Sequence, residues 1–397
     1  MPDDRSTTAG ISPGRLRNDL ADMRDRLTEW LFDKAYPLWW EDGADRQRGG
    51  YHERIGLNGV PILEPRRARV QPRQIYCFSV AHDLAWPEAS SEQIHHGLDY
   101  FEQAFGTSER YIISLVDAKD QVLDSSFDLY NQAFALFGYA AAARVLNDAS
   151  LIRRALRLKD YLEHEHRNPN GSFRARPDTS TPVLANPHMH LFEAALAWEE
   201  QAGGPWRQFA DEIATLALDH FVSPVTGALA EAFNDDWTPI DEGPVGIIEP
   251  GHQFEWAWLL ARWGIARGRA GAVDASRSLF RIAENAGVDA TRNAAIASVN
   301  FDLTKRDPLA RLWPQTERLK AALLLGKTAH DPDDAGKYDA AALSAAHCIE
   351  TFLDLEPRGL WRDKLRADGT FVEEPAPASS FYHIVGAVVE LNRLASN

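Results

Sequence analysis

The sequence predicts an all-α fold, an (α/α)6 barrel of six helical hairpins with short β-hairpins in the rim loops. Twelve segments carry apolar residues at the three- and four-residue spacing of a buried helix face. Short polar clusters open every second segment, at intervals of 56 to 66 residues. Polar groups at the same end of alternate helices converge only if those helices form an inner ring. The repeat therefore favours a closed toroid over an open solenoid.

The predicted helices follow one another with glycine-containing or polar breaks between them. They begin near Arg15, Gln71, Ser91, Phe127, Leu151, Pro187, Trp206, Gly251, Ala272, Trp313, Tyr338 and Phe381. Strand-like sequence is confined to the connections, where hairpins are expected at residues 50–59, 171–174 and 361–371. Each hairpin precedes a helix that carries a polar cluster. We therefore expect the hairpins to surround one mouth of the barrel.

Composition and length limit the domain organisation, the partners and the location that can be expected for this chain. Residues 1–397 are interpreted as a single catalytic domain, because six closing hairpins share one core and no linker interrupts them; residues 1–13 are expected to form a flexible tail. The formal net charge of −16, without a Lys/Arg block, argues against nucleic acid as a partner. No apolar run suits a membrane span or a signal peptide, so we expect a cytoplasmic protein without a membrane partner. Homo-oligomerisation is left open.

Histidines in the clusters are the first candidates for chemistry. Four of the 13 lie there: His188, His190, His252 and His383. Imidazole both takes and gives a proton near neutral pH, and the equivalent positions of His252 and His383 in successive repeats favour catalysis over a structural role. His190 and His252 are each followed three residues later by a glutamate on the same helix face, Glu193 and Glu255. Such a carboxylate can fix an imidazole tautomer or contact a substrate hydroxyl.

A metal site is the competing interpretation of these histidines. His188 and His190 could bind one ion only in an extended segment, because helical residues two apart point about 200° away from each other. The remaining His and Glu residues lack a spacing typical of zinc or manganese sites. No metal is therefore expected, and His188 is interpreted as structural. Walker A, GxGxxG, GxSxG and CxxC motifs are absent from the sequence, so no cofactor is expected either.

Other cluster residues could bind a small polyhydroxylated molecule. Arg73 opens an otherwise apolar helix, where burial needs an anionic or polyhydroxyl partner; a salt bridge to a neighbouring helix is the alternative. Tyr130 and Trp313 could offer a hydroxyl and a ring face to a sugar. Glu317 and Arg318 are expected to pair across helices in a structural role.

These clusters resemble those of the N-acylglucosamine 2-epimerase family, which includes mannose isomerases, cellobiose 2-epimerases and sulfoquinovose isomerases. They occur in the same order as in that family, and the resemblance covers nearly the whole chain. The most specific segments are residues 186–194 (NPHMHLFEA), 249–256 (EPGHQFEW), 313–317 (WPQTE) and 379–383 (SSFYH). The resemblance implies an (α/α)6 barrel that binds an aldose and transfers protons with histidines and no metal. A departure at Asn131-Gln132 leaves the polar contact near Tyr130 open.

The resemblance also implies roles for individual positions. His383 and His252 correspond to the acid/base pair, and His190 and Glu255 to ring-opening or orienting groups. The implied and inferred substrate contacts are Arg73, Tyr130, Asn186, Glu193 and Trp313.

The segment at residues 378–383 and the short chain most resemble the mannose isomerases. We therefore expect metal-free interconversion of D-mannose and D-fructose through a cis-enediol(ate), with His383 as the base at C2. A 2-epimerase acting on mannose, glucose, cellobiose or N-acylglucosamine is an alternative. So is a sulfoquinovose isomerase, for which the sequence locates no cationic contact. From other classes, a glycoside hydrolase would use two of Glu193, Glu255 and Glu317, and a non-catalytic binding protein would use none.

Overall fold

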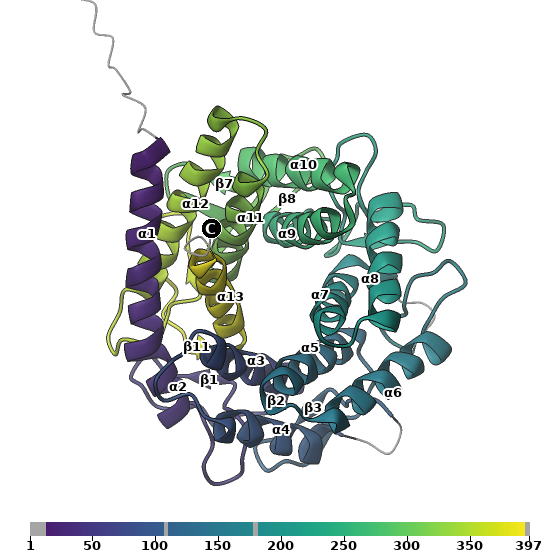
Figure 1. Cartoon of the computed structure of the whole chain (residues 1–397), viewed down its shortest axis with the longest axis vertical. Helices are drawn as coiled ribbons and strands as arrows, with labels where there is room; N and C mark the ends of the chain where they lie inside the picture. Colours follow the sequence, from purple (N-terminus) through teal and green to yellow (C-terminus); the bar gives the residue numbers. More distant parts are fainter. Residues whose placement is uncertain (1–12, 107–109, 178–181, 394–397) are drawn as a thin grey trace, which may run out of the picture.

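The computed structural model describes residues 13–106, 110–177 and 182–393. Within these ranges, two concentric rings of helices surround a central axis (Figure 1). The inner ring comprises α3 (Val70–Asp83), α5 (Leu129–Leu146), α7 (Ala185–Ala202), α9 (Pro250–Arg267), α11 (Leu312–Lys327) and α13 (Phe381–Asn392). The outer ring comprises α1 (Pro13–Trp30), α4 (Ser91–Phe105), α6 (Ala149–Glu165), α8 (Gly204–Leu216), α10 (Ala270–Gly287) and α12 (Pro332–Leu353). The predicted tail lies outside the described residues, except for Pro13, which begins α1.

Contacts between helices show that the inner ring closes and that the first and last outer helices meet. Each inner helix packs against the next one along the chain, and α13 packs against both α11 and α3; in the outer ring, α1 packs against α12. An open solenoid would leave the first and last repeats apart. The (α/α)6 prediction is therefore confirmed. None of the helices in the described ranges combines the length and hydropathy that crossing a bilayer requires.

Short helical segments complete the path of the chain. A π-helical turn, η1 (Leu31–Ala35), joins α1 to α2 (Tyr36–Glu41); a second, η2 (Ala217–Phe221), follows α8, and a 3-10 turn, η3 (Ala378–Ser380), leads into α13. The ring of Trp39 in α2 stacks on Trp361 and Phe381, with centroids 4.9 and 5.7 Å away. These contacts join the beginning of the described chain to its end.

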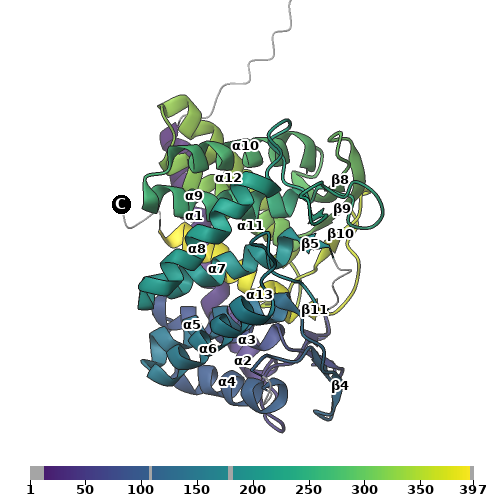
Figure 2. The ribbon, with the colours of Figure 1, turned by 90° about the vertical axis from the view of Figure 1, so that its right-hand side faces the viewer.

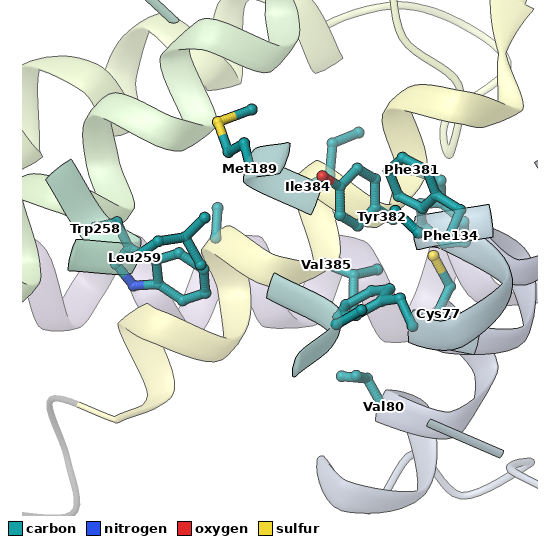
Figure 3. Packing of buried hydrophobic residues seen from close by; sticks show 14 of the residues in the cluster. Cys77, Val80, Phe134, Met189, Trp258, Leu259, Phe381, Tyr382, Ile384 and Val385 are labelled. Carbon is teal, nitrogen blue, oxygen red and sulfur yellow. The ribbon is translucent and has the colours of Figure 1, made fainter. Parts of the chain in front are cut away.

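Helices of the outer and inner rings differ in how much of their surface is buried, as their sequences predict. The outer helix α4 buries one stripe, which includes Ile94, Leu98 and Phe101, and begins with a capping box between Ser90 and Gln93. Inner helices are buried almost all round because neighbours cover both sides. Their apolar side chains belong to one continuous cluster, part of which is drawn in Figure 3, with labelled residues from α3, α5, α7, α9 and α13.

A repeated hydrogen-bond pattern fastens the loop before most inner helices. The side-chain amide of Gln71 donates to the carbonyl of Tyr51 and accepts from its N–H, both at 2.8 Å. The same pair of bonds joins Gln132 to Ile112, Gln253 to Leu229 and Gln315 to Ala295. Part of the sequence repeat is therefore structural. Gln132, at the position where the chain departs from the family pattern, fixes a loop in this way.

Short antiparallel strands gather on one side of the barrel, before the amino-terminal ends of the inner helices, as predicted (Figure 2). They are β2 (Arg66–Arg67) with β3 (Leu115–Val116) and β4 (Val122–Asp124), and β5 (Val183–Leu184) with β6 (Ala232–Phe233). A four-stranded sheet, which the sequence did not indicate, has the order β10 (Lys364–Leu365), β9 (Lys305–Arg311), β8 (Ala294–Val299) and β7 (Val288–Asp289). The turn expected at residues 58–59 brings Ile55 close to Pro61, but the strand partner of β1 (Arg54–Ile55) is the distant β11 (Ala376–Pro377).

Candidate active site

A polar cavity of about 280 Å³ lies at the amino-terminal ends of the inner helices. All six inner helices, or the turns that lead into them, contribute to its wall. The lining residues are Arg67, Arg69, Arg73, Tyr130, Asn186, His190, Glu249, His252, Glu255, Arg311, Trp313, Ser379, Ser380 and His383. The predicted convergence on one central site is therefore observed. Of the predicted site residues, Glu193 alone is not part of this wall; it is buried beside His190 and lines a different cavity of about 350 Å³.

His383 belongs to a buried chain of three polar side chains. Its Nδ1 lies 2.7 Å from Glu317 Oε1, and Lys320 Nζ donates to Glu317 Oε2 at 2.6 Å. Burial opposes ionisation of Glu317, but the charge of Lys320 and the hydrogen bond from His383 lower its pKa to about 2. The ionised carboxylate fixes the proton of His383 on Nδ1. Burial lowers the pKa of His383 to about 4, so its neutral ring can accept a proton at Nε2 near pH 7.

His252 has the opposite protonation state. Its Nδ1 lies 2.8 Å from Glu231 Oε2 and 3.8 Å from Glu249 Oε2. Burial favours the neutral imidazole, but the charges of Glu231 and Glu249 outweigh it and raise the pKa of His252 to about 10. His252 is therefore a proton donor at neutral pH, while His383 is an acceptor. Two groups whose surroundings drive their pKa values apart are suited to act as an acid/base pair.

Trp313 lies against both imidazoles. Its ring centroid is 5.2 Å from that of His252 and 5.5 Å from that of His383. The indole reaches this place because α9 begins with Pro250-Gly251: a Cβ at Gly251 would lie 2.4 Å from Trp313 Cη2. The glycine in this cluster is thus required by close packing of the aromatic ring.

His190 and Glu255 form a second polar group in the cavity. His190 Nδ1 lies 3.3 Å from Glu193 Oε2 and 3.8 Å from Glu255 Oε1, and the Tyr382 hydroxyl donates to Glu255 Oε1 at 3.3 Å. Burial lowers the pKa of His190 to about 4. Burial and the nearby charges of Glu317 and Glu193 raise the pKa of Glu255 well above its usual value. Glu255 can therefore hold a proton to donate, while His190 can accept one.

Two buried polar groups in the wall lack hydrogen-bond partners. Arg73 donates from one terminal nitrogen to the Tyr130 hydroxyl at 2.6 Å, but its Nε is buried without a partner. Asn186 Oδ1 is also buried without one. The salt bridge considered for Arg73 is not found among the described residues; its guanidinium instead lies 3.9 Å over the Phe134 ring. Both residues line the cavity, and a wall rich in polar side chains suits a ligand rich in hydroxyl groups.

Several functional residues were missed or misjudged from sequence. Glu317 and Arg318 both pair across helices, as expected: Arg318 with Glu284 of α10, and Glu317 with His383 of α13. The contact with a cavity-lining histidine was not foreseen for Glu317, which was expected to be structural. Lys320 was missed although its position three residues after Glu317 could have suggested a pair on one helix face. Glu231 was also missed, because it lies in a rim loop and only the folded chain brings it to His252.

Metal binding can be tested against the donor atoms. Three groups of side chains bring potential ligand atoms within 4.8 Å of one another: His190, Glu193 and Glu255; Glu231, Glu249 and His252; Glu255, Glu317 and His383. In the third group, Glu317 already accepts from His383 and Lys320, so a cation would compete with an ammonium group for the same carboxylate. The pair His188/His190 cannot chelate, because both ring nitrogens of His188 are bonded to backbone groups of Phe173 and Leu184. This contact confirms the structural role predicted for His188.

Comparison with known proteins agrees with this geometry. The sequence profile of the family described as N-acylglucosamine 2-epimerase (GlcNAc 2-epimerase) matches residues 49–387. The chain belongs to the N-acylglucosamine 2-epimerase family. Within the family, it is 45% identical over 370 residues to the mannose-6-phosphate isomerase of Rhizobium meliloti (strain 1021), a match that covers 92% of this chain and 95% of that protein.

Solved structures of N-acylglucosamine 2-epimerase family members share the fold. Cellobiose 2-epimerase from Bacillus thermoamylovorans B4167 superimposes with a TM-score of 0.84 at 18% identity, over 94% of this chain and 99% of that one. A D-mannose isomerase superimposes with a TM-score of 0.81 at 19% identity, over 98% and 100%. The family and these relatives identify the chain as a sugar isomerase or epimerase.

Proposed function

We propose that this protein is an aldose–ketose isomerase that interconverts D-mannose and D-fructose without a metal ion. One observation carries the proposal: two imidazoles, His383 and His252, line a single cavity in opposite protonation states that Glu317 and Glu231 maintain. Relatives named as isomerases of D-mannose or of mannose 6-phosphate support a mannose-type aldose as the substrate class.

The first step exposes the aldehyde, because mannose in solution is mainly a closed ring. Ring opening removes the proton of the C1 hydroxyl and adds a proton to the ring oxygen. His190, neutral at pH 7, is the acceptor, and Glu255, whose raised pKa favours its protonated form, is the donor. Arg73 and Asn186, which line the cavity, hold the sugar during this step.

The second step moves a proton between carbon atoms. His383 Nε2 accepts the proton from C2, the C2–H electron pair forms the C1=C2 bond, and the carbonyl electrons move to O1. Protonated His252 and the Arg73 guanidinium stabilise the charge on O1, and His252 supplies its proton there. His383 then returns a proton to C1, while the O2 hydroxyl gives its proton back to His252 as the C2 carbonyl forms. The product is fructose, and both histidines regain their starting states.

The same pair of imidazoles keeps a 2-epimerase as the second candidate. If His252 returned a proton to the opposite face of C2, the product would be glucose. A glycoside hydrolase has less support, because both oxygens of Glu317 are engaged by His383 and Lys320 and cannot serve as its second carboxylate.

Product analysis of chelator-treated enzyme with D-mannose tests the proposal. We expect fructose as the main product, and a fall in turnover of at least about 100-fold in His383→Asn with an unchanged circular-dichroism spectrum. His347→Asn, which changes an exposed histidine of α12 outside the cavity, is the matched control and should keep full activity. Retained turnover in His383→Asn would contradict the assigned base, and glucose as the main product would favour the epimerase.

A further inference from the structure

The wall of the cavity is rich in arginine although the whole chain has a formal net charge of −16. Four arginines line it: Arg67, Arg69, Arg73 and Arg311. The carboxylates in the lining are Glu249 and Glu255. His252 is positively charged but is paired with Glu231. Whether the wall has positive charge to offer a ligand therefore depends on how each arginine is paired.

The four arginines differ in how their charge is balanced. Arg67 donates to Glu53 from Nε and from its backbone N–H, at 2.7 and 2.6 Å, and Arg311 is paired with Asp363. Arg69 has no carboxylate partner in the described part of the chain; it makes one long contact of 3.4 Å to Asn131 Oδ1 and lies 5.4 Å over the Tyr130 ring. Burial and the like charges of Arg67 and Arg73 disfavour the charged guanidinium of Arg69 and lower its pKa. Tyr130 and Asp128 favour the charged form only through longer-range attraction. Arg69 therefore has donors and charge that the protein itself does not satisfy.

The position of Arg69 relative to the reacting end of the site is set by helix α3. Arg69 is the residue immediately before the helix, and Arg73 lies one turn further in, about 6 Å along the axis. Arg73 is the donor that we place near O1 of the sugar. A group bound by Arg69 would thus lie towards the rim, away from the carbon atoms that exchange protons. Arg67, on the adjoining strand β2, lines the same part of the cavity.

We propose that Arg69, supported by Arg67, binds a phosphate or sulfonate group at C6 of the sugar, so that the preferred substrate is an anionic aldose. The inference rests on the proposed isomerase function and specifies the charge of its substrate. Guanidinium groups bind tetrahedral oxyanions through paired, charge-assisted hydrogen bonds, whereas a hydroxymethyl group would leave most donors of Arg69 unused.

Steady-state kinetics with D-mannose, D-mannose 6-phosphate and 6-deoxy-6-sulfo-D-mannose test this subsite. For the wild type, we expect kcat/KM at least about 10-fold higher for one of the anionic sugars than for mannose. Arg69→Gln should lower that value about 10- to 100-fold, mainly through KM, and lower kcat/KM for mannose by a clearly smaller factor. The higher kcat/KM of the two anionic sugars identifies whether the subsite prefers a phosphate or a sulfonate. Raised ionic strength should weaken the binding of the anionic substrate only.

Arg54→Gln is the matched control, because Arg54 lies on the rim strand β1, is paired with Glu64 and does not line the cavity. A wild-type preference for neutral mannose, or equal losses for neutral and anionic sugars in Arg69→Gln, would overturn the subsite and leave the isomerase intact. If no sugar is turned over, the proposed function fails, but calorimetric titration with D-mannose 6-phosphate still tests the anion subsite. Binding to the wild type that is lost in Arg69→Gln supports the subsite. Equal binding to the two proteins, or no binding to the wild type, overturns it.

Discussion

Glu317 accepts a hydrogen bond from His383 Nδ1 at 2.7 Å, and both side chains are buried where α11 and α13 begin. Because the carboxylate is held ionised, the imidazole has its lone pair on Nε2, the nitrogen that a base must offer to the substrate. The contact thus suits His383 to the role of base proposed above, with Nε2 as its one available reactive atom.

Replacement of Glu317 by glutamine should remove this control. A glutamine amide can donate to Nδ1 and stabilise the tautomer that has its proton on Nε2, where it blocks the base. We expect kcat for mannose to fall at least about 100-fold. Glu284→Gln is the control, because Glu284 is also ion-paired but lies on the outer helix α10. Turnover within threefold of the wild type in Glu317→Gln would show that the tautomer of His383 is set in another way.

Lys320 should matter chiefly for stability and for the charge of Glu317. Its ammonium is buried and bonded to Glu317 Oε2, so Lys320→Met leaves a buried carboxylate with one cationic partner fewer. We expect a loss of about 3–5 kcal/mol in the free energy of unfolding, measured with denaturant. The double variant Glu317→Gln/Lys320→Met should lose less than Lys320→Met alone, because no unpaired charge remains. A larger, additive loss in the double variant would argue against this pairing.

The pH dependence of kcat/KM should show a broad plateau. Activity should fall on the acid side as His383 becomes protonated, near its pKa of about 4, and on the alkaline side as His252 loses its proton, near about 10. Glu231→Gln removes a charge that raises the pKa of His252, so its alkaline limb should move to lower pH while the acid limb stays in place. An unmoved alkaline limb would mean that His252 is not the group that titrates.

The same histidines should affect stability in opposite directions. His383 has a folded pKa below the usual value near 6.5, so the unfolded chain binds more protons between about pH 4 and 6.5, and its contribution to stability is lost as pH falls through this window. His252 has a folded pKa of about 10, so its contribution is complete below about pH 6.5 and is lost as pH rises towards 10. Denaturant titrations of His252→Gln against wild type should show the difference between them shrinking as pH rises.

Gly251→Ala should displace Trp313. The new methyl group would lie 2.4 Å from the indole, which must move away from His252 and His383. We expect kcat/KM to fall at least about 10-fold and stability to fall by about 1–3 kcal/mol. Gly271→Ala in α10 is the control, because no atom lies within 4 Å of its added Cβ; it should be neutral or slightly stabilising. Equal kcat/KM values in the two variants would show that the position of Trp313 does not affect catalysis.

The polar clusters predicted the six hairpins and nearly all of the cavity wall, because a repeat of helical hairpins leaves a regular pattern in the sequence. The pattern could not separate loop-fastening residues such as Gln132 from catalytic ones such as His252, since both types occupy the same turn of successive helices. The pattern also could not predict the contact of Glu231 with His252 or the pairing of β1 with β11. Such contacts join segments that are separated in sequence and depend on closure of the ring.

The most direct test of metal-free isomerisation by two histidines is proton NMR of chelator-treated enzyme with D-mannose in D2O. The predicted result is fructose with deuterium entering at C1, at a rate that a chelator does not change. Glucose labelled at C2 would contradict the isomerase and indicate a two-base epimerase. Turnover that disappears with the chelator and returns with a divalent cation would contradict the metal-free mechanism.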